Sequence, residues 1–140
     1  MPYYLDDLKP GMSESFTKQV TERDVELFGE VSGDMNPAHF DEEWAKATIF
    51  KGRIAHGVLT ASYISTVLGM KMPGPGTIFI ALGTQFKAPV RIGDTVTATC
   101  TVREVIADKR RVLFDCVCKV GDKVVIEAEA AVMPPSRPKA

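Results

Sequence analysis

The two histidines of the chain, His39 and His56, both lie in a region rich in Gly, Asp, Asn and Pro. Asp34 precedes His39 by five residues, and Pro37 between them favours a turn that can direct both side chains into one pocket. A carboxylate beside an imidazole suits general acid–base catalysis, because one group can accept a proton while the other donates one. The alternative is structural: Asp34 would bond to local backbone N–H groups, and His39 would be a half-exposed loop residue.

A second candidate site is the pair His56-Gly57, which immediately precedes a long uncharged segment. If that segment is a helix, the Gly57 N–H is one of the unpaired donors at its N-terminus, where the helix dipole also favours negative charge. Because glycine has no Cβ, a substrate carbonyl could approach this N–H closely, as in an oxyanion hole. The alternative is a glycine required for tight packing between the helix and a sheet.

Other polar residues give weaker indications. Ser62 and Ser65 are three residues apart and would share one face of the same helix, although helical serines commonly bond to the preceding turn. The basic run at 108–111 is either a solvated turn between strands or a contact for the phosphates of a nucleotide-bearing ligand. The sequence has no Gly-rich phosphate loop and no His/Cys cluster with metal-ligand spacing, so no metal site is expected.

Length and charge bound the remaining possibilities. With 140 residues against a prior of roughly 150 per domain, we expect one domain over 1–140. The 17 Lys and Arg against 18 Asp and Glu give a net charge of -1, so nothing supplies the basic field that nucleic acid binding requires. The three cysteines lie in alternating apolar stretches, which indicates reduced thiols rather than disulfides or a zinc site.

We expect neither a targeting segment nor a membrane span from the sequence. The first ten residues lack the basic start and apolar run of a signal peptide. The longest stretch without Asp, Glu, Lys or Arg, 54–70, is too short and too polar to span a membrane. We therefore expect a soluble, cytoplasmic protein.

The candidate residues lie between predicted helices. Thr21 followed by Asp24 is typical of a helix start, and apolar residues at helical spacing predict a helix of about ten residues that ends at Gly33. The segment 33–37 predicts an ordered loop, after which Asp41 can cap a second short helix that ends near Ala47. The uncharged segment 57–70 predicts a central helix enclosed by other structure.

Everything downstream has the period of strands. Strict alternation predicts a strand over 95–103, and further strands are expected over 111–120 and 123–133, joined by a turn at Gly121-Asp122. Shorter strands are expected over 77–82 and 84–87, and the Pro-rich tail 134–140 is expected to be frayed. Early helices and late strands predict an α+β fold in which a largely antiparallel sheet wraps around the uncharged helix.

These motifs together resemble a known family. The segment Phe28 to Asp41, followed by Phe50 and by Ile54-Ala55-His56-Gly57, resembles the hydratase 2 motif of the MaoC-like (R)-specific enoyl-CoA hydratases. The resemblance covers nearly the whole chain and departs at Val58, where a methionine is common in the family. Further matching segments are 73–77, 86–90 and 93–96.

The resemblance implies a hot-dog fold, an antiparallel sheet curled around a central helix, in a homodimer whose two sheets join. It assigns the catalytic pair to Asp34 and His39 and the oxyanion amide to Gly57. It further implies that Asn36 helps to order the loop and that Ser65 is a substrate-binding residue.

The activity implied by the resemblance is the hydration of trans-2-enoyl-CoA to (R)-3-hydroxyacyl-CoA. Coenzyme A would be part of the substrate, its pantetheine arm would enter near a subunit interface, and no metal or redox cofactor would be required. Polyester precursor supply and fatty-acid turnover both fit the family. The alternatives are an acyl-carrier-protein dehydratase, a thioesterase and a non-catalytic acyl-CoA-binding domain. Enzymes of the first two classes typically carry a carboxylate on or near the central helix of this fold. The segment 54–70 contains no carboxylate, which counts against both.

Overall fold

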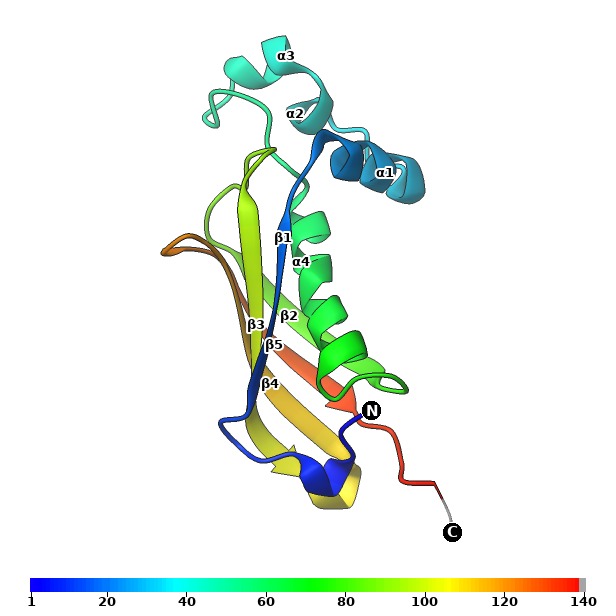
Figure 1. Ribbon diagram of the computed structural model, residues 1–140. Helices are drawn as coiled ribbons and strands as arrows, with labels where there is room; N and C mark the ends of the chain where they lie inside the picture. The colour runs from blue at the N-terminus through cyan, green and yellow to red at the C-terminus, as the bar shows by residue number, and fades with distance from the viewer. Residues whose placement is uncertain (139–140) are drawn as a thin grey trace.

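The fold is a curved antiparallel sheet with one helix lying along its concave face (Figure 1). The structure is a computed structural model that describes residues 1–138. Its strands are β1 (Ser13–Gln19), β2 (Ile78–Phe86), β3 (Thr95–Ile106), β4 (Arg111–Val120) and β5 (Lys123–Met133). Its helices are η1 (Leu5–Asp7), α1 (Glu22–Ser32), α2 (Pro37–Phe40), α3 (Glu42–Lys46), α4 (Gly57–Thr66), η2 (Val67–Lys71) and η3 (Ala107–Lys109).

The sheet has the strand order β1-β3-β4-β5-β2, and every neighbouring pair is antiparallel. The expected strands over 111–120 and 123–133 and their turn at Gly121-Asp122 are confirmed. The strand expected over 95–103 is also confirmed and continues to Ile106. The basic run at 108–111 lies between β3 and β4, where Asp108, Lys109 and Arg110 are exposed and Arg111 begins β4.

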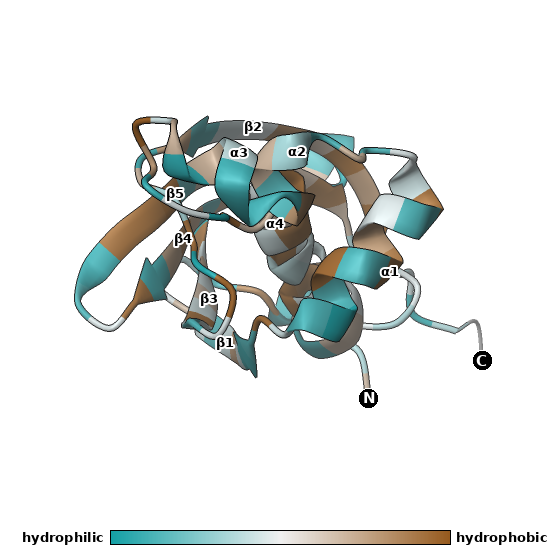
Figure 2. Cartoon of the chain, turned by 90° about the horizontal axis from the view of Figure 1, so that it is seen from above, coloured by the Kyte–Doolittle hydropathy of each residue, from teal (hydrophilic) through white to brown (hydrophobic). Residues whose placement is uncertain are grey.

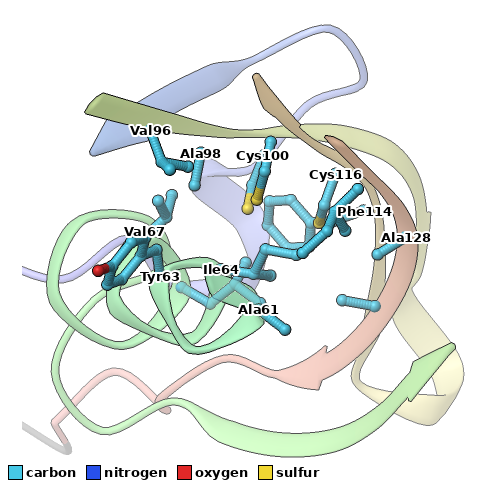
Figure 3. Packing of buried hydrophobic residues seen from close by; sticks show 14 of the residues in the cluster. Ala61, Tyr63, Ile64, Val67, Val96, Ala98, Cys100, Phe114, Cys116 and Ala128 are labelled. Atoms are coloured by element: carbon cyan, nitrogen blue, oxygen red, sulfur yellow. The ribbon is translucent and has the colours of Figure 1, made fainter. Parts of the chain in front are cut away.

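The core lies between α4 and the sheet. The alternation predicted for β3 is confirmed, because its inward residues are buried and face α4 (Figure 3). Each large apolar side chain that is fully buried, such as Ile64, contributes roughly 1.5–3 kcal/mol to stability. The cysteines are free and buried, as expected for reduced core residues. Residues that meet in this core include Ala61, Tyr63, Val67, Val96, Ala98, Cys100, Phe114 and Cys116.

Helices α1, α2 and α3 gather beyond the end of the sheet where α4 begins (Figures 1 and 2). Helix α1 confirms the expected first helix. The Thr21 hydroxyl accepts from the Asp24 N–H at 3.1 Å, and the Asp24 carboxylate accepts from the Thr21 N–H at 3.0 Å. The helix ends at Gly33, whose φ of 79° is a left-handed conformation that glycine adopts without strain.

The expected loop over 33–37 is shorter than its sequence indicates. Pro37 occupies the first position of α2, because its fixed φ suits a helix start and it lacks the N–H that would go unpaired there. Asn36 caps this helix through a 3.0 Å bond from the Ala38 N–H to its Oδ1. Asp41 caps α3 in the same way, as expected, with a bond from the Trp44 N–H. The predicted central helix is also present, although its last turn, η2, is a π-helix.

Two strands differ from the prediction. The short strands expected over 77–82 and 84–87 form one strand, β2, because Gly83 pairs with Glu129 of β5 and does not interrupt the ladder. Strand β1 was not predicted from the sequence. Its residues are mostly polar on both faces, and its partner β3 lies far away in the sequence, so alternation gives no signal there.

The described part of the tail, 134–138, contains no helix or strand. Arg137 in this segment nevertheless bonds to the carboxylates of Asp6 and Asp7 near the start of the chain. The last two residues of the predicted frayed tail lie outside the described residues. Among residues 1–138, no helix is long and apolar enough to cross a membrane.

Candidate active site

Asp34 lies in the loop between α1 and α2 and is held at three of its polar groups. Its N–H donates to Ser32 Oγ at 3.1 Å, and its Oδ1 accepts from the Asn36 N–H at 3.2 Å. Its backbone carbonyl accepts a third bond, at 2.9 Å, from His56 Nε2. The second carboxylate oxygen, Oδ2, has no hydrogen bond to the described residues. The side chain is exposed, so this oxygen is available to an incoming molecule.

His39 lies on α2 and is buried. Its Nδ1–H donates to the Ile54 carbonyl at 2.8 Å, which leaves Nε2 as the nitrogen with a free lone pair. Its backbone carbonyl accepts a 2.7 Å bond from Arg53 Nε, and both terminal nitrogens of Arg53 bond to Glu22 of α1. Burial lowers the pKa of the His39 imidazole below its ordinary value of 6.5. The neutral ring can therefore accept a proton at neutral pH.

His56 brings the two candidate catalytic residues together. Its ring lies 4.0 Å from the ring of His39, centre to centre, while its Nε2 bonds to the backbone of Asp34. A carboxylate oxygen of Asp34 and one ring nitrogen from each histidine all lie within 4.8 Å of one another. The pair expected from the spacing of Asp34 and His39 is therefore close in space, at the point where α4 begins.

Gly57 is the first residue of α4, and its N–H is one of the donors that have no partner within the helix. A Cβ at this position would lie 2.8 Å from two ring atoms of Phe86, so the close approach of Phe86 requires glycine. Gly57, Ile54 and Phe86 line a mostly apolar cavity of 450 Å³, together with Phe50, Ala55, Val58, Thr60, Lys87, Ala88, Pro89, Val90 and Ile126.

The cavity and the candidate acid–base pair are adjacent but separate. Neither Asp34 nor His39 is among the lining residues, yet the carbonyl of the lining residue Ile54 holds the His39 ring. Gly57 connects the two places, because it lines the cavity and directly follows His56. The N-terminus of α4 therefore lies between the cavity and the candidate acid–base pair.

The remaining candidates lie in different places. Asn36 is in the loop that carries Asp34, where it caps α2 and bonds to Asp34. Ser65 is exposed on α4, more than two helical turns beyond Gly57, and the structure does not bring it to the Asp34–His39 pair. Ser62 donates to the Leu59 carbonyl at 2.5 Å, which is the structural role considered from the sequence.

The cluster of Asp34, His39 and His56 also has the composition of a divalent metal site. Two of its four ring nitrogens already bond to backbone carbonyls, which leaves His39 Nε2, His56 Nδ1 and the Asp34 carboxylate as possible ligands. The expectation from the sequence that the protein uses no metal stays a prediction.

Sequence reasoning missed part of this site. It noted His56 as one of two histidines and as the residue before Gly57, but it assigned no role to His56, Arg53 or Phe86. These residues act through partners distant in sequence, such as the Asp34 carbonyl, the His39 carbonyl and the Gly57 backbone. The only available signal was the scarcity of histidine, since the second of two histidines lies beside a candidate oxyanion glycine.

Comparison with known proteins shows the family to which the chain belongs. Residues 8–129 match the family described as "MaoC like domain", and the chain belongs to this family. Over 96% of its length it is 53% identical to the (R)-specific enoyl-CoA hydratase of Rhodospirillum rubrum, covering 94% of that protein. It is 45% identical to the 3-hydroxybutyryl-CoA dehydratase of Methylorubrum extorquens, covering 98% of this chain and 87% of the other.

A more distant relative is the mitochondrial 3-hydroxyacyl-[acyl-carrier-protein] dehydratase of Arabidopsis thaliana, 31% identical over 92% of this chain and 79% of that protein. The unliganded R-hydratase of Pseudomonas aeruginosa has a TM-score of 0.91 at 36% identity, covering 97% of this chain and 88% of that one. The (R)-hydratase from A. caviae involved in PHA biosynthesis has a TM-score of 0.88 at 34% identity, covering 91% of this chain and 98% of that one. The family resemblance and the hot-dog fold expected from the sequence are confirmed.

Proposed function

We propose that this protein is an enzyme that hydrates trans-2-enoyl-CoA to (R)-3-hydroxyacyl-CoA and catalyses the reverse dehydration. The observation that carries the proposal is the proximity of Asp34 and His39 at the N-terminus of α4, beside the backbone N–H of Gly57. The activities named for the two most similar of the relatives described above support the same reaction.

In the proposed mechanism, a water molecule binds between Asp34 Oδ2 and His39 Nε2. The water oxygen forms a bond to the β-carbon as its O–H bond breaks, and Asp34 and His39 share the proton transfers. A proton is delivered to the α-carbon, so H and OH are added across the double bond and the electrons balance. The Gly57 N–H and the helix dipole stabilise the negative charge that develops on the thioester oxygen.

The same geometry determines the stereochemistry of the proposed reaction. Asp34 and His39 come from neighbouring segments, so they act on one face of a substrate held at Gly57. Water and proton then arrive from the same side, which gives syn addition. The (R) configuration of the product is supported by the names of the relatives.

The proposed substrate brings coenzyme A with it. The apolar cavity beside Gly57 is suited to an uncharged part of the thioester, and the pantetheine arm enters near a subunit interface. The proposal includes no redox cofactor, because addition of water transfers no electrons. It includes no metal, because the Gly57 N–H supplies the polarisation of the carbonyl. Asn36 orders the catalytic loop through its bonds with Asp34 and Ala38, and the family resemblance alone supports a substrate contact by Ser65.

The proposal extends to one domain over 1–140, a homodimer, a cytoplasmic location and a place in acyl-CoA metabolism. The apolar edge strand β2 supports the dimer, since an unpaired edge of this kind favours pairing with a second copy. Free buried thiols are typical of reducing compartments, where coenzyme A thioesters also occur. Supply of polyester precursors is supported by the similarity to the A. caviae hydratase, which is described as involved in PHA biosynthesis, and fatty-acid turnover requires the same chemistry.

The second candidate function is dehydration of 3-hydroxyacyl groups carried by an acyl carrier protein. The Arabidopsis thaliana relative favours it, because that protein is named for such a substrate. A non-catalytic acyl-CoA-binding domain would also retain the fold, but it would not need both Asp34 and His39. Rates with crotonyl-CoA and with crotonyl-acyl carrier protein distinguish the two enzymatic alternatives.

The central experiment follows the loss of enoyl absorbance with crotonyl-CoA and longer enoyl-CoA esters. We expect hydration, and an (R)-specific 3-hydroxyacyl-CoA dehydrogenase coupled to the reaction should then produce NADH. An (S)-specific dehydrogenase should produce almost none. No hydration of any enoyl-CoA would refute the proposed reaction, and a strong signal with the (S)-specific enzyme would refute its stereochemistry.

A further inference from the structure

His56 is placed as a helix cap but does not act as one. It occupies the N-cap position of α4, yet its side chain makes no capping bond to that helix. The ring is almost completely buried, at 1% exposure. Its Nε2–H instead donates to the backbone carbonyl of Asp34, 22 residues earlier in the chain. The bond connects the start of α4 to the loop that carries the proposed catalytic carboxylate.

The surroundings of the ring determine which nitrogen carries the proton. Nδ1 of His56 is buried and has no hydrogen-bond partner among residues 1–138. A proton on Nδ1 would therefore have no acceptor, whereas a proton on Nε2 is bonded to the Asp34 carbonyl at 2.9 Å. The Nε2–H bond to Asp34 is thus the one hydrogen bond of the His56 side chain among the described residues.

The ring of His56 also supports the second catalytic residue. It lies between three aromatic neighbours, with centre-to-centre distances of 4.8 Å to Phe28, 5.6 Å to Phe40 and 4.0 Å to His39. The bond from His39 Nδ1 to the Ile54 carbonyl fixes one edge of the His39 ring, and contact with His56 fixes one face. Both constraints leave Nε2 of His39 free.

We infer that His56 is a positioning residue for the proposed hydration, one that holds the Asp34 backbone through Nε2–H and the face of His39 through its ring. This inference rests on the proposed function. A histidine that only filled the core would need no bond to Asp34, and an apolar ring would fill the same space without a buried nitrogen that lacks a partner. The unpartnered Nδ1 is therefore the cost of having the Nε2–H donor beside the Asp34 carbonyl.

Two substitutions separate the hydrogen bond from the packing. His56→Phe keeps a ring between Phe28, Phe40 and His39 but removes the donor. His56→Gln loses the ring but can place an amide N–H where Nε2 lies. We expect His56→Phe to lower kcat about 10- to 100-fold with KM within about 2-fold, because misplacement by about 1 Å costs this much. His56→Gln should recover most of the loss. The control is Tyr63→Phe, which removes from α4 a buried hydroxyl that has no partner among the described residues and should leave kcat unchanged.

A second measurement does not depend on activity. In wild-type protein, ¹⁵N chemical shifts of the histidine rings should show the proton on Nε2 of His56 and on Nδ1 of His39. The ¹³C shift of the Asp34 carbonyl should move in His56→Phe and return toward wild type in His56→Gln. This measurement applies even if His56→Phe does not fold, because the two tautomers are determined on the wild type.

The outcomes distinguish the inference from the proposed function. Loss of kcat in His56→Phe with recovery in His56→Gln, or the expected tautomers with the Asp34 shift, supports positioning by His56. Wild-type kcat in His56→Phe, or the opposite tautomer of His56 in the wild type, overturns it. If the wild type hydrates no enoyl-CoA, the proposed function fails, and the chemical shifts still decide whether His56 holds the Asp34 loop.

Discussion

Asp34 can lose its carboxylate and keep its hydrogen bonds, whereas His39→Ala also removes the bond to the Ile54 carbonyl. Asp34→Asn retains an Oδ1 that can accept from the Asn36 N–H, so the loop should keep its shape while the carboxylate is lost. We expect Asp34→Asn and His39→Ala each to lower kcat by at least about 100-fold, because a positioned proton-transfer group typically contributes 10²–10⁴. The measurement is loss of enoyl absorbance with crotonyl-CoA. Near-wild-type hydration, with circular dichroism and oligomeric state unchanged, would show that the acid–base pair is assigned wrongly.

The protonation of His39 predicts a pH dependence. Burial is the main cause that lowers the pKa of this imidazole below 6.5, and the positive charge of Arg53 acts in the same direction. The bond to the Ile54 carbonyl acts in the opposite direction but does not reverse the shift. Protonation removes the lone pair on Nε2, so we expect kcat/KM to be constant near pH 7 and to fall only below pH 6.5. An acid limb centred above pH 6.5 would contradict the assignment.

The same lowered pKa affects stability with a defined sign. As the pH falls through 6.5, the His39 side chain takes up a proton in the unfolded chain before it does so in the folded protein. Since stability rises with pH wherever the unfolded state binds more protons, the contribution of His39 is fully present above pH 6.5 and is lost below it. Chemical denaturation at a series of pH values should show this loss in the wild type, and a smaller one in His39→Ala.

At the residue scale, the sequence predicted candidate site residues but not the hydrogen bonds that join them. Asp34 and His39 are five residues apart, so local spacing was enough to pair them, and Gly57 was visible because it begins an uncharged segment. The partner of His56 is a backbone carbonyl distant in the sequence, and no residue type marks that atom. Ser65 was assigned by the family resemblance, because its spacing from Ser62 on one helix face was only a weak local indication.

At the element scale, elements with local signals were predicted and those held by distant partners were not. Helix α1 has its own cap and stop, and β3 to β5 alternate and follow one another in the chain. Strand β1 is held by pairing with β3, and a ladder of hydroxyl groups connects the two strands, such as Ser15 with Thr99 at 2.7 Å. Because this pairing links residues 84 apart, β1 could not be recognised from its own sequence.

The start of α4 gives the prediction at this scale. In Gly57→Ala, the new Cβ would lie 2.8 Å from two ring atoms of Phe86, so the ring or the helix must move. Phe86 is half exposed and can swing outward, so the protein should fold. We expect kcat to fall at least about 10-fold, because the Gly57 N–H and the cavity wall are displaced together.

Gly69→Ala is the matched control for this prediction, since a Cβ at Gly69 in η2 meets nothing within 4 Å. Its kcat should equal that of the wild type. Hydration kinetics and circular dichroism on both variants decide the matter. Equal rates in Gly57→Ala and Gly69→Ala would exclude a role for the close approach at Gly57.

At the scale of the whole molecule, the two edges of the sheet differ. Edge strand β1 carries charged and hydroxyl side chains, which disfavour pairing with another chain. Edge strand β2 is exposed along most of its length and is apolar, with Ile78, Phe79, Ile80, Leu82 and Phe86 all in contact with solvent in a single protomer. A stable protein covers such a strand, and a second copy of the same strand provides a two-fold symmetric cover.

The strand β2 also ends at the proposed active site, because its last residue, Phe86, lies against Gly57 and lines the cavity. Dissociation of a dimer formed through β2 should therefore lower activity as well as mass. Ile80 is suited to a test, since the β2–β5 pairing skips it at a bulge between Phe79 and Ala81. A lysine there adds charge to the outer edge without breaking a backbone pair inside the protomer.

We expect wild-type protein at micromolar concentration to sediment at twice the 15.3 kDa mass of the chain. Ile80→Lys should shift it toward the monomer, because joining two copies would place two buried lysines near each other. Its hydration rate should fall with the dimer fraction, since the partner strand would no longer cover the strand β2 that ends at Phe86. Ile49→Lys, at an exposed apolar residue after α3, should change neither mass nor rate. A wild-type monomer that still hydrates enoyl-CoA would remove the joined sheet from the proposal, together with the binding of pantetheine at a subunit interface.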